Sequence, residues 1–120
     1  MNAAVLGAGP GGLAIAAELS LAGHEVTLAD LPEFSDRLSA VRDRGGVRVA
    51  SGWYGDRVVP VRAAESVAGA VEGAELVVLS VRAPGHRPFA EAVAPVLGPG
   101  AALVFMGEGG GAVVAREPAR

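Results

Sequence analysis

Cysteine and lysine are both absent from this chain of 120 residues. Without cysteine, the chain has no thiol nucleophile, no disulfide and no cysteine-ligated metal, and its two histidines, His24 and His86, lie far apart in the sequence. We therefore expect no metal site. Without lysine, no residue is available for a Schiff base, a phosphate-binding P-loop or a Tyr-x-x-x-Lys pair, which excludes P-loop NTPases and short-chain dehydrogenases.

Charge of one sign and long apolar runs are also scarce. The formal net charge is −3, and the ten arginines are scattered along the sequence, so we expect no basic stripe for a nucleic acid. No apolar run approaches the roughly 20 residues that span a bilayer, and no cationic segment opens the chain as a targeting signal would. These features predict a cytoplasmic protein that binds neither nucleic acid nor a membrane.

Glycine, by contrast, is abundant, and its most informative occurrence is a G-x-G-x-x-G pattern directly after a short apolar run. In dinucleotide-binding folds the first glycine makes a tight turn out of a strand, the second lets the backbone approach a pyrophosphate, and the third lets a helix pack closely on the strand. The N–H groups at the start of that helix then face the anion. The pattern predicts a pyrophosphate-binding loop formed by Gly7, Ala8, Gly9, Pro10, Gly11 and Gly12.

Apolar segments alternate with helical patterns along the rest of the chain. This order predicts an α/β fold, a Rossmann-like doubly wound parallel sheet in a three-layer α/β/α arrangement, with the ligand cleft at the carboxyl ends of the strands. The turns after Leu6, Ala29, Val81 and Met106 should converge there. We expect strands at 2–6, 25–29, 47–50, 57–61, 75–81 and 101–106, helices at 10–22, 31–44, 64–71 and 86–97, and a helix start or a tail at 112–120.

A length of 120 residues suits one domain but not a cofactor domain together with a substrate domain. We therefore expect residues 1–120 to form a single NAD(P)-binding domain, truncated before a helical substrate and catalytic domain. No nucleophile beside a base and no pair of carboxylates can be assembled from the sequence, so we assign no catalytic residue.

Asp30 follows the second expected strand, 18 positions after Gly12. An acidic residue about 20 positions after the glycines accepts hydrogen bonds from the ribose hydroxyls and repels a 2′-phosphate, which favours NAD over NADP. NADP sites place an arginine just beyond the strand, whereas the nearest arginine here is Arg37. The alternative is that Asp30 N-caps a helix beginning at Pro32.

Several other residues are candidates with competing interpretations. Val81, Arg82 and Ala83 follow the central strand, where backbone lines the nicotinamide side of such clefts, and the guanidinium of Arg82 suits an anion. Arg82 is equally well explained as a surface residue. His86 is more often structural than a ligand donor, and His24 is expected to face solvent away from the cleft. Trp53 and Tyr54 either stack on a base or seal a core edge, and the glycine-rich loop 107–111 either meets an anion or is a simple connection.

Taken together, these motifs resemble the NAD-binding half of the opine (octopine and nopaline) dehydrogenases, in the 6-phosphogluconate-dehydrogenase-like superfamily. This resemblance implies hydride transfer from NADH to the imine of an amino acid and a 2-oxo acid, with a catalytic His–Asp pair in a following helical domain. The chain alone would then bind cofactor without turnover. The resemblance is carried by residues 7–12, 23–26, 45–47, 70–78, 83–87 and 109–112.

Two other functions fit the same loop. The sequence from Gly7 to Leu13 also resembles the start of FAD-dependent oxidoreductases, although those usually carry glutamate where Asp30 lies. A non-catalytic module that senses NAD(H) is the second alternative. A Rossmann half with uncovered apolar faces also predicts a homodimer.

Overall fold

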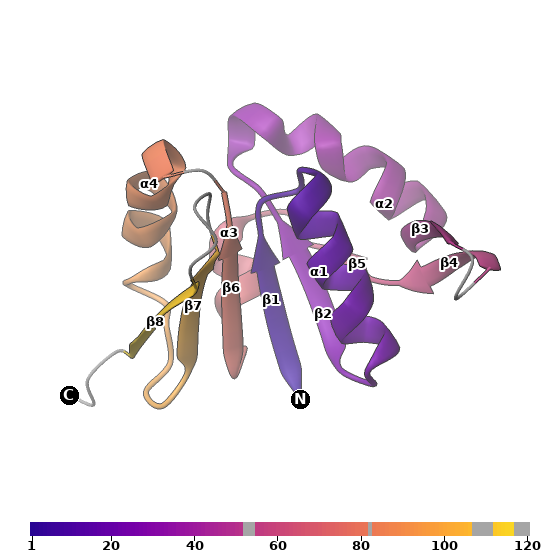
Figure 1. The fold of residues 1–120 in the computed structure, drawn as a ribbon. Helices are drawn as coiled ribbons and strands as arrows, with labels where there is room; N and C mark the ends of the chain where they lie inside the picture. The colour runs from indigo at the N-terminus through magenta and orange to yellow at the C-terminus, as the bar shows by residue number, and fades with distance from the viewer. Residues whose placement is uncertain (52–54, 82, 107–111, 117–120) are drawn as a thin grey trace.

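A mainly parallel sheet forms the centre of the molecule, with its described strands in the order β5-β2-β1-β6-β7-β8 (Figure 1). The computed structural model describes residues 1–51, 55–81, 83–106 and 112–116. All neighbouring strands of this sheet run parallel except β7 and β8. The bounds are β1 Asn2–Leu6, β2 Glu25–Ala29, β5 Arg62–Ala63, β6 Leu76–Ser80, β7 Ala102–Met106 and β8 Ala112–Arg116.

Strands β1 and β6 are central because their apolar side chains are buried on both faces of the sheet. Val5 pairs with Leu28 on one side and with Val78 on the other. The run Leu76-Val77-Val78-Leu79 lies at the middle of the sheet, as expected for a parallel strand covered on both faces. The predicted doubly wound parallel fold is confirmed.

Helices cover both faces and divide the core in two. Helix α1 (Pro10–Leu21), the 3-10 helix η1 (Pro32–Leu38) and α2 (Ser39–Arg44) contribute side chains to one cluster, while α3 (Val67–Val71) and α4 (Ala83–Val93) contribute to the other. Because side chains alternate along a strand, Val78 joins the α1 cluster and Leu79 joins the α3 cluster. The layers on either side of the sheet are visible in Figure 1.

A separate antiparallel hairpin lies against α1. Its strands are β3 (Gly46–Ser51) and β4 (Gly55–Pro60), and both contact α1. Val47 and Val59 point into the α1 cluster, whereas Arg48 and Asp56 form an exposed ion pair with an N–O distance of 2.8 Å. Both strands are as predicted, although β3 is one residue longer at each end, and β4 begins two residues earlier and ends one residue earlier than expected.

Three sequence expectations were wrong in detail. The segment 31–44 is not one helix: residues 32–38 form the 3-10 helix η1, which is kinked at Phe34 (φ −116°), and the α-helix α2 begins only at Ser39. The short strand β5, which pairs with Thr27 and Leu28 of β2, was not predicted. Residues 112–116 form neither a helix nor a tail: they make β8, which satisfies the edge of β7 by antiparallel pairing.

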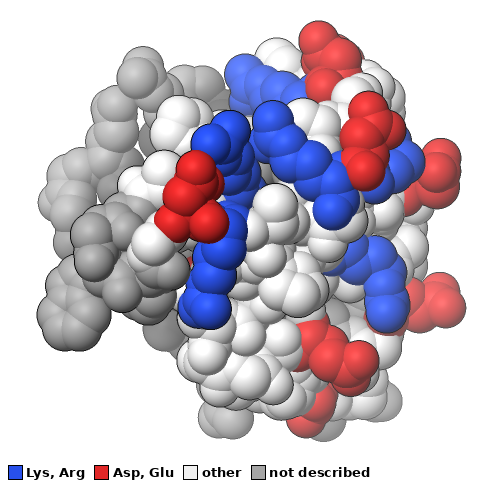
Figure 2. Space-filling view, turned by 90° about the vertical axis from the view of Figure 1, so that its right-hand side faces the viewer, with Lys and Arg blue, Asp and Glu red and all other residues white. Residues whose placement is uncertain are grey.

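Contrary to the expectation that the arginines are scattered, they are concentrated in one part of the chain. Residues 37–62 contain six of the ten arginines and only two acidic residues. Figure 2, which faces the side of α2 and the β3–β4 hairpin, shows several arginine side chains close together with acidic ones around them.

None of the described helices is long and apolar enough to cross a membrane. Among the described residues, no group of histidines and acidic residues is arranged to hold a metal ion.

Candidate functional site

The turn between β1 and α1 requires glycine at two positions. Gly7 has a φ of +106°, and a Cβ at this position would lie 2.5 Å from the carbonyl oxygen of Ser80. A Cβ on Gly12 would overlap the carbonyl oxygen of Gly7, so α1 packs onto the turn more closely than any side chain allows. These are the two structural roles predicted for the first and third glycines of the pattern.

Gly9 has a different environment. It is the N-cap of α1, no side chain caps the helix, and the carbonyl of Gly9 accepts the first helical hydrogen bond from Leu13 N–H at 2.9 Å. Among the described residues outside the loop's own neighbours, the only atom within 4 Å of a Cβ built on Gly9 is Nη1 of Arg37, at 3.9 Å. The space beside Gly9 is therefore open, and the helix end that faces it favours negative charge.

Asp30 is buried at the end of β2, with 6% of its surface exposed. Its Oδ2 accepts a hydrogen bond of 2.9 Å from Ala8 N–H, and its Oδ1 accepts one of 2.8 Å from Leu31 N–H. The carboxylate thus ties the glycine loop to the second strand. The alternative role as an N-cap is wrong, because Leu31 is the N-cap of η1 and no side chain caps that helix.

Arg37 lies next to Asp30 although seven positions separate the two residues. Helix η1 folds the chain back, so that Nη1 of Arg37 is 3.7 Å from Oδ2 of Asp30. The guanidinium carbon lies 4.4 Å from the ring centroid of Phe34, within the range of a cation–π contact. The sequence argument treated Arg37 as too distant from the strand end to matter, and the structure corrects this.

A cavity of about 1020 Å³ opens beside the glycine loop and joins these features. It is bounded by residues that follow or end β1, β2, β6 and β7, so the predicted convergence of four strand ends is confirmed. Its lining is Gly7, Ala8, Gly9, Pro10, Gly11, Leu13, Ile15, Asp30, Leu31, Phe34, Arg37, Ser80, Val81, Phe89 and Met106.

The predicted site residues are only partly brought together by the described structure. The glycine loop, Asp30 and the half-buried Val81 line the cavity, while Gly12 packs behind the loop. Arg82 lies outside the described residues, and of Ala83 and His86 only the backbone, within α4, is described. Trp53, Tyr54 and the loop 107–111 also lie outside the described residues.

Sequence reasoning missed Ser80, Phe34 and Phe89 as lining residues. Ser80 had a usable signal, because it is the first polar residue after the apolar run of a buried strand, where side chains reach the cleft. Phe34 and Phe89 had none, since each reaches the cavity through the path of its helix.

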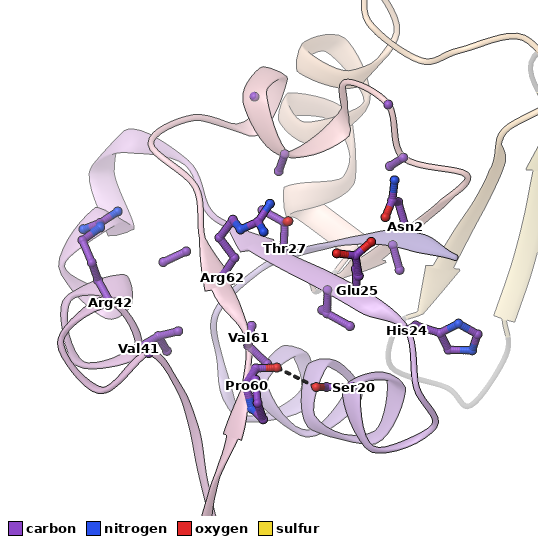
Figure 3. A pocket seen from close by; sticks show the side chains of 18 of the residues that line it. Asn2, Ser20, His24, Glu25, Thr27, Val41, Arg42, Pro60, Val61 and Arg62 are labelled. Atoms are coloured by element: carbon purple, nitrogen blue, oxygen red, sulfur yellow. Dashed lines mark hydrogen bonds between the residues drawn. The ribbon is translucent and has the colours of Figure 1, made fainter.

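A second cavity, of about 740 Å³, lies at the amino-terminal ends of β1 and β2 and is drawn in Figure 3. Arg42, Arg62 and Glu25 line it, and Ser20 Oγ donates a 2.6 Å hydrogen bond to the carbonyl of Pro60. His24 is also at this end, away from the glycine loop as predicted, but it is partly buried rather than fully exposed. This cavity lies at the opposite end of the strands from the helix terminus and glycine loop that define the first.

Comparison with known proteins assigns this geometry to a family. The sequence profile of the ketopantoate reductases, PanE/ApbA, matches residues 3–117, nearly the whole chain. The chain belongs to the ketopantoate reductase PanE/ApbA family. Its fold and family are those of an NAD(P)-binding oxidoreductase domain. No protein with a curated description matched the sequence.

Solved structures agree with the family. A ketopantoate reductase from Ralstonia eutropha JMP134 is 32% identical, with a TM-score of 0.72, over 89% of this chain and 34% of its own. A ketopantoate reductase described as putative, from Ralstonia solanacearum MolK2, is 28% identical, also with a TM-score of 0.72, over 88% of this chain and 31% of its own. The chain thus spans about a third of the length of these relatives. Glycerol-3-phosphate dehydrogenase from Coxiella burnetii, at 20% identity and a TM-score of 0.70, shares the fold.

The family match refines the resemblance drawn from the motifs. An NAD(P)-dependent oxidoreductase domain of the 6-phosphogluconate-dehydrogenase-like superfamily is supported. The opine dehydrogenase family itself is not shown, because the matching profile is that of the ketopantoate reductases.

Proposed function

We propose that this chain is the dinucleotide-binding part of an NAD(P)H-dependent reductase that acts on a 2-oxo acid. The observation that carries the proposal is the meeting of an uncapped helix end, a glycine loop and four strand ends around one cavity. The substrate class rests on the family, whose members carry the names ketopantoate reductase and 2-dehydropantoate 2-reductase. Imine reduction of the opine type has no support from a described residue.

The residues present fit a dinucleotide. Gly9 leaves open the space in which a pyrophosphate would meet the start of α1, and the loop Gly7–Gly12 supplies the backbone around it. Asp30 is placed to accept from the ribose hydroxyls with the lone pairs that Ala8 and Leu31 leave free. Val81, Arg82 and Ala83 are assigned to the nicotinamide side. When bound, the reduced nicotinamide supplies the hydride, while the chain binds, orients and shields it.

We infer that the chain by itself binds cofactor without turnover, since no described residue combines a nucleophile or proton donor with a partner base. Asp30 further favours NADH over NADPH, because a buried carboxylate repels a 2′-phosphate. A homodimer, expected from the sequence, stays a prediction that light scattering tests.

The glycine loop gives the sharpest test. Gly9→Val places a side chain beside the helix end, where the half-exposed guanidinium of Arg37 is the one described group within 4 Å of the Cβ, so the fold should be retained while a pyrophosphate is blocked. Titration of the chain with NADH, followed by energy transfer from its one tryptophan, Trp53, should show saturable binding. The variant should bind at least about tenfold more weakly, as expected when contacts to a charged group are lost.

Thermal unfolding of both proteins, measured in parallel, separates loss of binding from loss of fold. Equal binding by Gly9→Val, or no binding of either dinucleotide by the parent chain, would contradict the proposal. Copurification of yellow FAD would support the flavoprotein alternative. Tighter binding of NADPH than of NADH would contradict the preference assigned to Asp30 and leave the rest of the proposal intact.

A further inference from the structure

The guanidinium of Arg37 lies at the entrance of the cavity, and none of its N–H groups donates a hydrogen bond to a residue that the structure describes. Its side chain is 48% exposed and lines the cavity together with Phe34. The face of the guanidinium rests on the Phe34 ring, 4.4 Å from the centroid, so the N–H groups at its edge remain available. Its one polar contact among the described residues is with Asp30, at 3.7 Å, which is longer than a hydrogen bond.

Asp30 does not depend on Arg37. Its two carboxylate oxygens already accept hydrogen bonds from backbone N–H groups of Ala8 and Leu31. If the guanidinium turns toward a ligand, the buried carboxylate therefore keeps its partners, and no uncompensated group is left behind. Arg37 is free to exchange a weak contact with Asp30 for a stronger one.

The position of Arg37 specifies which ligand group it meets. In the proposed function, Asp30 binds the ribose of the adenosine half of the dinucleotide. Nη1 of Arg37 lies 3.7 Å from the carboxylate of Asp30 and 3.9 Å from a Cβ built on Gly9. A 2′-phosphate at that ribose carries nearly two negative charges and three acceptor oxygens, for which a guanidinium offers bidentate geometry.

We propose that Arg37 sets the cofactor selectivity of this chain by offsetting the repulsion of Asp30, so that the 2′-phosphate of NADPH is accepted as well as the free ribose of NADH. This inference rests on the proposed function. It makes the discrimination between the two dinucleotides narrow, with Asp30 favouring NADH and Arg37 lowering the cost of NADPH.

Calorimetric titration of the parent chain and of Arg37→Gln with four probes tests this assignment. The probes are NADH, NADPH, 5′-AMP and adenosine 2′,5′-bisphosphate. Arg37→Gln should weaken the binding of NADPH and of the bisphosphate on the order of tenfold, as expected for the loss of one charge-assisted contact. The affinities for NADH and 5′-AMP should change by less than about threefold. The affinity of Arg37→Lys for NADPH should lie between those of the parent chain and Arg37→Gln, because lysine keeps the positive charge but lacks the bidentate geometry of the guanidinium.

Arg42→Gln is the matched control. Arg42 is similarly exposed, at 44%, but it faces Glu65 and lines the second cavity. It should leave all four affinities unchanged. Equal weakening of phosphorylated and unphosphorylated probes by Arg37→Gln, or the same effect from Arg42→Gln, would overturn the inference while leaving the proposed function intact. Failure of the parent chain to bind any dinucleotide would overturn both.

Discussion

At the residue scale, the glycine turn shows that one residue type serves different needs at neighbouring positions. Gly7 has a positive φ, and a Cβ there would meet the carbonyl of Ser80. A Cβ on Gly12 would overlap the carbonyl of Gly7, whereas Gly9 leaves space open beside the helix end. The requirements at Gly7 and Gly12 are structural, whereas the requirement at Gly9 follows from the proposed binding of a dinucleotide. Substitutions should therefore separate stability from binding within a single motif.

Gly12→Ala should destabilise the fold. Its Cβ would overlap backbone, which cannot move aside as a flexible side chain can, so we expect a loss of about 1–3 kcal/mol or more in the free energy of unfolding. Urea denaturation of the chain measures it. Gly98→Ala is the control, because no atom of a described residue lies within 4 Å of a Cβ built there and its φ is not positive, so this change should be neutral or slightly stabilising. Equal stability of the two variants would contradict the packing argument.

At the element scale, the β3–β4 hairpin carries the electrostatic contact with the clearest effect on titration. Both nitrogens of the Arg48 guanidinium edge donate to the two oxygens of Asp56, at 3.0 and 2.8 Å. These hydrogen bonds, and then the opposite charge, lower the pKa of the Asp56 carboxyl below its usual value and raise the pKa of Arg48. The pair is exposed, so its contribution to stability should be small.

The direction of the pKa shift predicts a dependence on pH. Because the pKa of Asp56 is lower in the folded state, its contribution is complete above the usual aspartate value of about 3.9 and is lost as the pH falls through the folded value. NMR titration of the Asp56 carboxyl should give a pKa below the usual aspartate value of about 3.9. Arg48→Gln should bring Asp56 back toward its usual value. A pKa of Asp56 at or above the usual aspartate value would refute the paired geometry.

At the scale of the whole molecule, the sheet separates two cores that share strands but no buried side chains. Val41 belongs to the cluster beneath α1 and α2, and Val71 to the cluster beneath α3 and α4. The division follows from alternation of side chains along each strand, which sends neighbouring residues to opposite faces. The cavity beside the glycine loop lies at one end of the sheet, where the ends of several strands meet.

Substitutions in the two cores should act independently. Val41→Ala and Val71→Ala should each cost about 2 kcal/mol, and the double variant should equal their sum within about 0.5 kcal/mol. Val67→Ala combined with Val71→Ala, two residues of α3 in one cluster, should depart from additivity. Urea unfolding of the single and double variants measures both couplings. A large coupling between Val41 and Val71 would mean that the cores are not separate.

The sequence by itself determined the fold class, the central strands and the glycine turn. Local patterns were sufficient there, because an apolar run followed by Gly7 and Gly12 has few other ways to pack a helix on a strand. The position of Asp30 at the end of β2 also followed from its spacing. Pairing over long distances had no such local signal, which is why β5 was missed and β8 was wrongly expected as a helix or a tail.

Only the tertiary structure decided what surrounds Asp30. Its hydrogen bonds to Ala8 and Leu31 depend on the approach of β1 to β2, and its neighbour Arg37 depends on the path of η1 after the kink at Phe34. Counting along the chain measures separation in sequence, whereas charge interactions depend on distance in space. Arg37, which its spacing in the sequence excluded as a neighbour of the strand end, is therefore the residue that the fold places beside the carboxylate of Asp30.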